Sequence, residues 1–422
     1  MLTPGQSLTL TIEKPAAGGR MIARHDGQVI LVGGAIPGER VCARVERSTR
    51  KVAYAETISV DEPSADRRAW DGDVACGGCL YAHIAYARQL DIKAAVIADA
   101  FARIGRIALP MPPQIVASPE SGYRMRARLH VRGLQLGFFR EATHDLCDPR
   151  QTRQLLPATC DVVERVGAVI RSLGLEAIRE IELAENGDAS ARVLALDAVS
   201  PIDQHALEQI AAVEGLTGVV SGGRTIGDAH VIDTIEIENT PKVQLRRHVL
   251  AFFQGNRFLL SRLAAHVASE IATGGNAIDL YAGGGLFSVA AAESRRARVV
   301  AVEGDRIAAA DLAANSSARP GITPVHQPVE QYLNRTYPDS RGADPDSVVI
   351  VDPPRTGMSK DALEGVIRLR APGIVYVSCD VATLARDARA LVEAGYNVQG
   401  ISAFDLFPNT PHVETVVTFT GR

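Results

Sequence analysis

The sequence predicts a multidomain protein with an N-terminal β-barrel, an α+β central domain and a C-terminal α/β domain built on a doubly wound parallel sheet. Its 422 residues are too many for one ordinary core, so two or three domains are expected. The first 60 residues contain short strands separated by glycine turns, whereas from about residue 246 strands alternate with helices, as in parallel sheets. The predicted domains are therefore residues 1–60, 61–245 and 246–422.

The first domain has the pattern of a small barrel. Apolar runs that favour strands lie at residues 8–12, 29–32, 40–45 and 53–60. They are separated by the turn signals Gly18-Gly19, Gly33-Gly34 and Pro37-Gly38. Residues 40–51 also contain five basic side chains and only one acid, Glu46. Because small barrels often bind nucleic acid, this basic segment is a candidate contact for a phosphate backbone.

The central segment contains a second basic pattern, on a predicted strand. Every second residue from 124 to 132 is basic: Arg124, Arg126, Arg128, His130 and Arg132. A strand presents alternate side chains on one face, so these five would form a polar, largely basic row. Such a row suits RNA, but a solvated face of a half-exposed strand explains the spacing equally well. Residues 61–75 are expected to form a linker and residues 82–104 a helix.

Composition excludes several classes of protein. Apolar residues make up 46% of the chain and charged residues 22%, which is typical of a globular protein. The net charge of −4 argues against a basic surface coat. We find no apolar run near the ~20 residues that cross a bilayer, no secretion signal and no disulfide framework in the six cysteines. These features predict a cytoplasmic enzyme without membrane association.

Three loops of the C-terminal domain carry chemically distinctive residues. Each follows an apolar run that predicts a buried strand. The loops are Gly283-Gly284-Gly285, Asp352-Pro353-Pro354-Arg355 and Ser378-Cys379-Asp380. Parallel strands place their carboxyl ends at one edge of the sheet, so we expect the three loops to face one crevice. A glycine loop, a carboxylate and a thiol together indicate a cofactor-dependent enzyme with a covalent step.

The glycine loop predicts the cofactor. It lies between a strand at 277–280 and a helix, and its spacing is not Gly-x-Gly-x-x-Gly, which disfavours a dinucleotide. The next strand ends at Glu303, whose carboxylate can accept both hydroxyls of a ribose. A surface carboxylate would fit that position about as well. Together the two features favour an adenosine cofactor without a pyrophosphate, namely S-adenosylmethionine.

The thiol and two carboxylates predict the reaction. Cys379 follows one strand, Asp352 another, and Glu414 begins the last apolar strand. A lone cysteine at a strand end is more often a core residue, but a thiolate beside a carboxylate and a methyl donor suits methylation at C5 of a pyrimidine. The thiolate adds to C6 and makes C5 nucleophilic. A carboxylate then removes the C5 proton so that the thiolate can leave.

These motifs resemble the RNA (uracil-C5)-methyltransferase family. The resemblance lies in Asp-Pro-Pro-Arg-x-Gly, Ser-Cys-Asp-x-x-Thr-Leu-Ala-Arg-Asp and Phe-Pro-x-Thr-Pro-His-Val-Glu, in this order, and in Phe252-Phe253-Gln254-Gly255-Asn256. The N-terminal segment is similar to the family's TRAM domain, an oligonucleotide-binding (OB) barrel, especially at residues 34–39. The segment Leu136-Gly137-Phe138-Phe139-Arg140 is like the family's central domain. The resemblance therefore covers nearly the whole chain.

By matching position, the resemblance assigns the site residues. Cys379 matches the nucleophile and Glu414 the base. Four further residues match ligands of S-adenosylmethionine: Gln254, Tyr281, Glu303 and Asp352. The implied substrate is a uridine in structured RNA, with ribosomal RNA favoured over transfer RNA and no obligate protein partner.

The cysteines of the central segment depart from the family pattern. Cys76-Gly77-Gly78-Cys79 looks like half of the family's four-cysteine [4Fe–4S] site, but Trp70 stands where another cysteine is expected. Cys147 and Cys160 both lie in the zone of the later cysteine. We take Cys76, Cys79 and Cys160 as candidate ligands, with Cys147 as an alternative. A complete cluster, a labile three-cysteine cluster and a relic without metal remain open, and a Cys-x-x-Cys pair could also hold zinc or be redox-active.

Two rival functions remain. N-methylation of a base or a protein amide often uses a Pro-Pro motif followed by an aromatic residue, whereas Arg355 stands here, and that chemistry leaves Cys379 unexplained. A non-catalytic RNA-binding member of the family is the second rival. The intact pair of Cys379 and Glu414 argues against it.

Overall fold

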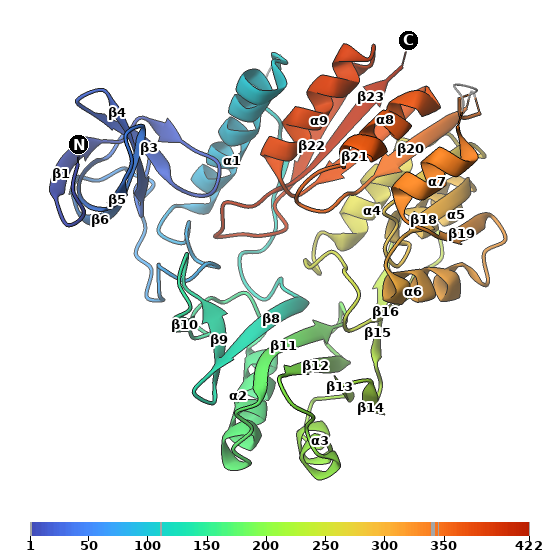
Figure 1. Cartoon of the computed structure of the whole chain (residues 1–422), viewed down its shortest axis with the longest axis horizontal. Helices are drawn as coiled ribbons and strands as arrows, with labels where there is room; N and C mark the ends of the chain where they lie inside the picture. The colour runs from blue at the N-terminus through green and yellow to red at the C-terminus, as the bar shows by residue number, and fades with distance from the viewer. Residues whose placement is uncertain (1, 110–111, 339–341, 345, 422) are drawn as a thin grey trace.

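The computed structural model describes residues 2–109, 112–338, 342–344 and 346–421 and has the predicted multidomain architecture (Figure 1). Among these residues, a six-stranded sheet forms the barrel, a seven-stranded sheet the central domain and an eight-stranded sheet the C-terminal domain. A hairpin of β15 (His230–Ile235) and β16 (Val243–His248) joins the last two. In Figure 1 the barrel and the C-terminal domain lie above the central domain, on either side of α1 (Tyr86–Ala100).

The barrel forms where the turn signals predict it. Its strand order is β1-β5-β6-β4-β3-β2. The strands are β1 (Ser7–Thr11), β2 (Lys14–Pro15), β3 (Met21–His25), β4 (Gln28–Gly33), β5 (Arg40–Ser48) and β6 (Val52–Glu62). The four predicted strands correspond to β1, β4, β5 and β6, and β2 and β3 are additional strands. Side chains alternate between buried and exposed along β1, because one face covers the apolar core.

The central sheet is covered by helices on one face only. Its strand order is β10-β9-β8-β11-β12-β13-β14. The elements are β8 (Arg126–Arg132), β9 (Gln135–Phe139), β10 (Leu146–Cys147), α2 (Pro157–Ser172), β11 (Ile178–Glu185), β12 (Arg192–Ala198), α3 (Gln204–Ala211), β13 (Gly218–Ser221) and β14 (Arg224–Gly227). The apolar sides of α2 and α3 pack with Leu129 and Ile181 of the sheet. The opposite face, with Arg128, lines a cleft of about 700 Å³ together with Arg306 of the C-terminal domain.

The C-terminal domain is a doubly wound sheet of order β19-β18-β17-β20-β21-β23-β22-β7. Its strands are β17 (Asn276–Leu280), β18 (Arg298–Glu303), β19 (Ile322–His326), β20 (Ser347–Val351), β21 (Gly373–Ser378), β22 (Asn397–Phe404) and β23 (Glu414–Thr420). Neighbours from β19 to β21 are parallel, and β23 is antiparallel to β21 and β22. This arrangement confirms the predicted fold class.

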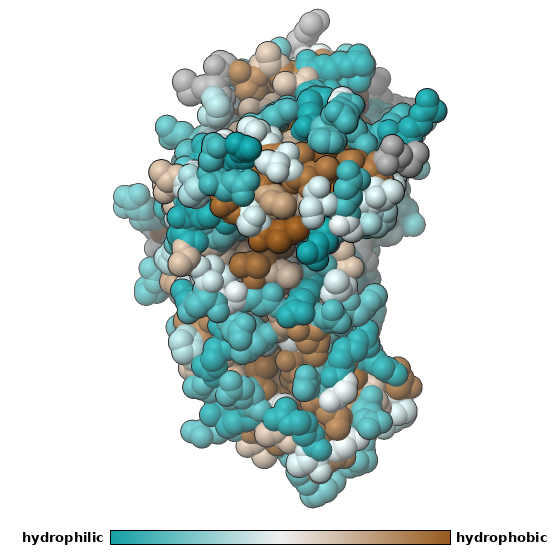
Figure 2. Space-filling view, turned by 90° about the vertical axis from the view of Figure 1, so that its left-hand side faces the viewer, coloured by the Kyte–Doolittle hydropathy of each residue, from teal (hydrophilic) through white to brown (hydrophobic). Residues whose placement is uncertain are grey.

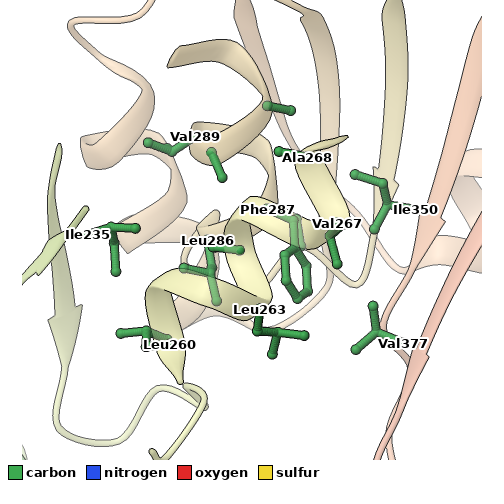
Figure 3. Close-up of a cluster of buried hydrophobic side chains, with 14 of the residues drawn as sticks. Ile235, Leu260, Leu263, Val267, Ala268, Leu286, Phe287, Val289, Ile350 and Val377 are labelled. Atoms are coloured by element: carbon green, nitrogen blue, oxygen red, sulfur yellow. The ribbon is translucent and has the colours of Figure 1, made fainter. Parts of the chain in front are cut away.

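Helices bury both faces of this sheet. Side chains of α4 (Leu260–Ser269) and α5 (Leu286–Arg295) gather against Ile350 and Val377 of the sheet (Figure 3). α6 (Arg306–Ser316) adds Leu312 to this core. The other face is covered by α7 (Val329–Thr336), α8 (Lys360–Leu369) and α9 (Val381–Glu393). Burial on both faces explains why the central strands are continuous apolar runs in the sequence.

Part of the segment 61–245 packs on the C-terminal domain. α1 continues into a short π-helical segment, Phe101–Gly105, and Ile97 and Phe101 are fully buried among residues of α8 and α9. β7 (Ile115–Val116) pairs in parallel with β22 at the edge of the sheet. The chain therefore touches the C-terminal domain before it enters the central sheet.

The surface is largely hydrophilic on the side shown in Figure 2. Apolar side chains form separate patches there, bordered by polar ones. Within the described ranges, no helix has both the length and the apolar character needed to cross a membrane.

Candidate active site

Four of the predicted site residues lie in one row at the carboxyl ends of parallel strands. β18 ends at Glu303, and three residues directly follow the ends of β17, β20 and β21: Tyr281, Asp352 and Cys379. Leu280 pairs with Val302 on one side and Val351 on the other, so Tyr281 lies between Glu303 and Asp352. Because these strands run in the same direction, their loops open at the same edge.

Glu414 reaches the same edge on an antiparallel strand. The last register pair of β21 and β23 is Ser378 with Thr415. Cys379 is the next residue after this pair on one side and Glu414 on the other, and the charge of Glu414 acts on the Cys379 thiol. Glu414 is only 2% exposed, and Cys379 is half-buried. The structure thus brings the predicted nucleophile and the predicted base together.

Burial and a nearby arginine govern the charges of this pair. Burial, together with Glu414 and Asp352, raises the pKa of Cys379 to about 12, and Arg355 opposes this rise through its charge and a hydrogen bond. Burial, and then Asp352, raises the pKa of Glu414 well above its usual value, which Arg355 again opposes. Arg355 is therefore a cation that favours the ionised form of both groups.

A tight turn holds Cys379 at the start of α9. The Asp380 N–H donates to Ser378 Oγ at 3.1 Å, and Asp380 Oδ1 caps the helix by accepting from the Thr383 N–H at 2.9 Å. Thr383 Oγ1 donates to the carbonyl of Arg355 at 3.1 Å, which joins this turn to the loop after β20. The positive end of a helix dipole stabilises a nearby thiolate and so lowers the pKa of the thiol.

The glycine loop turns sharply after β17. Tyr281, Gly283 and Gly285 all have positive φ, at 62°, 56° and 92°. For Tyr281 this conformation is rare, and such strain is typical of functional loops. Gly283 donates its N–H to Glu303 Oε2 at 2.7 Å, so the loop is fixed to the end of β18. Glu303 keeps acceptor capacity for further donors, since a carboxylate offers about four lone-pair sites.

The residues of this crevice fit S-adenosylmethionine. A Cβ added to Gly283 would meet no atom within 4 Å, so the backbone is open to a ligand. Asp279 Oδ1 is buried without a hydrogen-bond partner, while Oδ2 accepts from Ser288 Oγ at 2.5 Å. Burial raises the pKa of Asp279 to about 7. An unpaired buried acceptor next to an open glycine is what a bound polar ligand would satisfy.

Gln254 completes the row from a different segment. It lies between β16 and α4, is 5% exposed, and donates from Nε2 to Asp352 Oδ2 at 3.2 Å. Burial, then the charges of Asp279 and Glu303, raise the pKa of Asp352 to about 8, and the hydrogen bond from Gln254 opposes the rise. The charges of Asp279, Glu303 and Asp352 therefore act on one another in this crevice, where they would attract a positively charged cofactor.

The arginine row lies on one face of β8, as predicted, but three of its five basic side chains have acidic partners. Arg126 and Arg128 both form ion pairs with Glu182, and His130 pairs with Glu180. Arg124, which precedes β8, is partly buried and donates to Gln154 Oε1 at 2.5 Å. The neighbouring strand β11 therefore places two acids, Glu180 and Glu182, opposite the basic row.

The candidate cluster ligands do not come together. Cys76 forms a disulfide with Cys147, while Cys79 and Cys160 are buried free thiols. Burial raises the pKa of Cys79 to about 12 and that of Cys160 to about 11. In the part of the chain that the structure describes, no group of three or more His, Cys, Asp or Glu side chains could hold a metal ion. The residues therefore do not fit a four-cysteine cluster.

Several residues of the site were not predicted from the sequence as functional. Arg355 appeared only as a residue that disfavours N-methylation, although its place three residues after Asp352 was a usable signal. Asp279 lies in a strand and carries no motif of its own. Asn256 holds the segment of Gln254 in place by donating to Ser118 Oγ at 2.9 Å and to the Leu406 carbonyl at 3.1 Å.

The fold and the site define the class of protein. The doubly wound sheet carries an open glycine turn, a carboxylate at a position suited to a ribose, and a thiol with a neighbouring carboxylate. This is the arrangement of an S-adenosylmethionine-dependent methyltransferase. The attached barrel is of the kind that binds oligonucleotides.

Comparisons with known proteins identify the family. Residues 343–422 match the family model "tRNA (Uracil-5-)-methyltransferase", and residues 2–58 match the TRAM domain. The 23S rRNA (uracil(1939)-C(5))-methyltransferase RlmD of Pseudomonas putida is 31% identical over 98% of this chain and 94% of its own. An uncharacterized RNA methyltransferase of Thermotoga maritima is 29% identical over 96% of this chain and 97% of its own.

A solved structure supports the fold over nearly the whole chain. The tRNA (uracil-54, C5)-methyltransferase of Pyrococcus abyssi, in complex with S-adenosyl-L-homocysteine, superposes with a TM-score of 0.76 at 21% identity. The match covers 97% of this chain and 99% of that one. Together with the sequence relatives, this shows that the chain belongs to the S-adenosylmethionine-dependent RNA (uracil-C5)-methyltransferase family.

Proposed function

We propose that this protein methylates C5 of a uridine in ribosomal RNA through a covalent bond between Cys379 and C6 of the base. The observation that carries the proposal is that Cys379 and Glu414 lie at the adjoining ends of β21 and β23, where Asp352 and Arg355 act on both through their charges. The preference for ribosomal RNA rests on relatives that are 23S rRNA methyltransferases and span the whole chain.

The reaction divides between the thiol and the base. S-adenosylmethionine supplies an electrophilic methyl group on a positively charged sulfur when it is bound. The Cys379 thiolate forms an Sγ–C6 bond, and the electron pair of the C5=C6 double bond makes C5 nucleophilic. After C5 has taken the methyl group, Glu414 removes the C5 proton, the double bond re-forms and the Sγ–C6 bond breaks. The products are 5-methyluridine and S-adenosylhomocysteine, and the proton is left on Glu414.

Arg355 and the helix α9 have an electrostatic role in this scheme. The thiol must lose a proton although burial raises its pKa to about 12. Arg355 lowers the free-energy cost of losing this proton, and so does the amino end of α9 behind Cys379. Glu414 has to be ionised in order to abstract the C5 proton. The proton released from the thiol must therefore have left the active site before that second step.

The remaining site residues bind the cofactor in this proposal. Glu303 accepts hydrogen bonds from the ribose hydroxyls, and Tyr281 packs at the turn beside it. Gln254 and Asp352 form a hydrogen-bonded pair next to the positively charged sulfur. Arg126 lies 6.0 Å from the ring of the 60% exposed Phe252, which offers a flat surface to an RNA base.

The affinity for S-adenosylmethionine is expected to rise with pH. The pKa of Asp352 is raised to about 8, so at lower pH its carboxyl group is protonated and must lose that proton to pair with the positive sulfur. The Kd should fall by up to about tenfold per pH unit as pH rises to about 8, and then level off. Calorimetric titration across this range measures it.

S-adenosylhomocysteine is the matched control for this titration, because it carries the same amino and carboxyl groups but a neutral sulfur. Its affinity should change much less with pH, and Asp352→Asn should remove the difference between the two ligands. An equal pH dependence for both ligands would show that Asp352 does not sense the sulfur charge.

The substrate is tested by measuring 5-methyluridine in separated ribosomal and transfer RNA from cells with and without this gene. Deletion should remove 5-methyluridine from ribosomal RNA, and the wild-type gene, but not a Cys379→Ala copy, should restore it. Loss from transfer RNA alone would overturn the choice of RNA and keep the reaction. No change in either fraction, with no methylation of unmodified ribosomal RNA by the purified protein, would overturn the reaction itself.

A further inference from the structure

The loop between β22 and β23, residues 405–413, precedes the proposed base. It has no regular secondary structure, yet Asp405, Leu406, Asn409 and Thr410 are all at most 4% exposed. Glu414 follows this loop directly. A buried irregular loop must find partners for its backbone polar groups elsewhere.

The partners come from the segment 61–245. Lys93 Nζ on α1 donates to Asp405 Oδ1 at 2.6 Å and to the Phe407 carbonyl at 3.1 Å. Tyr123 Oη donates to the Pro408 carbonyl at 3.2 Å. The carbonyl of Asn409 accepts from the Tyr81 N–H at 2.8 Å. Four of the nine loop positions, 405 and 407–409, are therefore held by residues outside its own domain as well as by burial.

Asn409 and Gln89 form the centre of this contact. Gln89 Oε1 accepts from the Asn409 N–H at 2.9 Å, and Gln89 Nε2 donates to Asn409 Oδ1 at 2.9 Å. Gln89 is fully buried and Nε2 also donates to the carbonyls of Tyr81 and Ile84, each at 3.0 Å. Arg68 donates to Asn409 Oδ1 at 2.8 Å.

The backbone of Asn409 depends on this contact. Its φ of 64° lies in the left-handed region, which asparagine tolerates better than most residues. The residue bends the chain just before Pro411, and a Cβ on Gly19 of the barrel would lie 3.0 Å from Pro411 Cγ. The loop that leads to Glu414 is thus packed between the barrel, α1 and the C-terminal sheet.

We propose that Gln89 and Asn409 are positioning residues for the Glu414 base. This inference rests on the proposed function. The amide pair fixes the loop so that the Glu414 carboxylate meets the C5 proton of the adduct, while Cys379 is held separately by the turn before α9. Loosening the pair should therefore impair removal of the proton more than formation of the Sγ–C6 bond.

The test uses Asn409→Gly, because glycine keeps the left-handed backbone and removes only the side chain. We expect kcat to fall by about 10- to 100-fold, the order caused by a misplaced catalytic group, with the KM for S-adenosylmethionine unchanged. During turnover of uridine RNA, the fraction of enzyme found as a covalent, SDS-stable RNA adduct should rise, because the adduct forms but resolves slowly. Asn409→Asp, which keeps the acceptor for Gln89 and Arg68, should recover most of kcat.

Asn239→Gly is the matched control, since Asn239 is an exposed residue with φ of 61° in the β15–β16 connection. It should behave as wild type. Gln89→Glu provides a second variant of nearly the same size, in which the acceptor remains and the donor is lost, and it should show the same adduct accumulation if Asn409→Gly does not fold.

Two results would overturn the proposal. One is wild-type kcat in both Asn409→Gly and Gln89→Glu. The other is a parallel loss of adduct formation and turnover, which would mark a purely structural role. Failure of the proposed function would give another result. The wild-type protein itself would then form no adduct with RNA that contains 5-fluorouridine, whose C5 carries no proton to remove.

Discussion

Replacing Cys379 with alanine is expected to abolish methyl transfer and leave binding of S-adenosylmethionine intact. Without the thiolate no bond forms at C6, so C5 never becomes nucleophilic. Loss of a covalent nucleophile lowers kcat by about 10⁴- to 10⁶-fold. Cofactor affinity should change little, because the candidate ligands lie on β17, β18, β20 and the Gln254 segment rather than on the turn of Cys379.

The measurement combines methyl transfer with adduct formation. Wild-type protein should form an SDS-stable adduct with RNA that contains 5-fluorouridine, and Cys379→Ala should form none. Cys42→Ala is the matched control, since Cys42 is a half-buried free cysteine in the barrel strand β5. Methylation by Cys379→Ala at the wild-type rate would rule out the covalent mechanism.

The row of site residues could be predicted because the place of each residue follows from the strand next to it in the sequence. Asp352 and Cys379 directly follow apolar runs, and in a parallel sheet such positions share an edge. The pairing of Cys379 with Glu414 needed more than that. It depends on the antiparallel register of β21 with β23, which a motif match implies and a periodicity does not.

The arginine row shows where local reasoning fails. The period of two in residues 124–132 placed the side chains on one face correctly. Their partners, Glu180 and Glu182, lie on β11 some fifty residues later, and only the pairing of β8 with β11 sets them opposite Arg128 and His130. Charge neutralisation across strands cannot be seen along the chain.

The pairing of the cysteines and the contact of Asn409 with Gln89 could not be predicted from the sequence, for a related reason. Cys76 and Cys147 are 71 residues apart and meet through the tertiary fold, whereas the family resemblance gave Cys76, Cys79 and Cys160 as candidate ligands with Cys147 as an alternative. Gln89 and Asn409 are separated by 320 residues, Gln89 belongs to no motif, and Asn409 stands at the unspecified position of the motif that ends at Glu414. The first contact depends on how Cys76 packs against β10, and the second on how α1 packs against the loop before β23.

Glu414→Gln is expected to stop the reaction after methyl transfer rather than before it. Glutamine has the same shape and keeps a hydrogen-bonding group at this buried position, but it cannot accept the C5 proton. The Sγ–C6 bond therefore forms, C5 takes the methyl group, and elimination stalls. Loss of a general base lowers kcat by about 10²- to 10⁴-fold, and the enzyme should accumulate as a methylated RNA adduct.

The distinguishing measurement is a single-turnover burst with methyl-labelled cofactor. Glu414→Gln should transfer close to one methyl group per enzyme, and the label should remain with the protein on a denaturing gel even after nuclease digestion of the RNA, because the methylated nucleotide stays bonded to Cys379. Glu238→Gln, on an exposed side chain in the β15–β16 connection, should give normal turnover with no retained label. If Glu414→Gln transferred no methyl group at all while still binding cofactor and RNA, Glu414 would be required for addition of the thiolate, and the division of labour between Cys379 and Glu414 would be wrong.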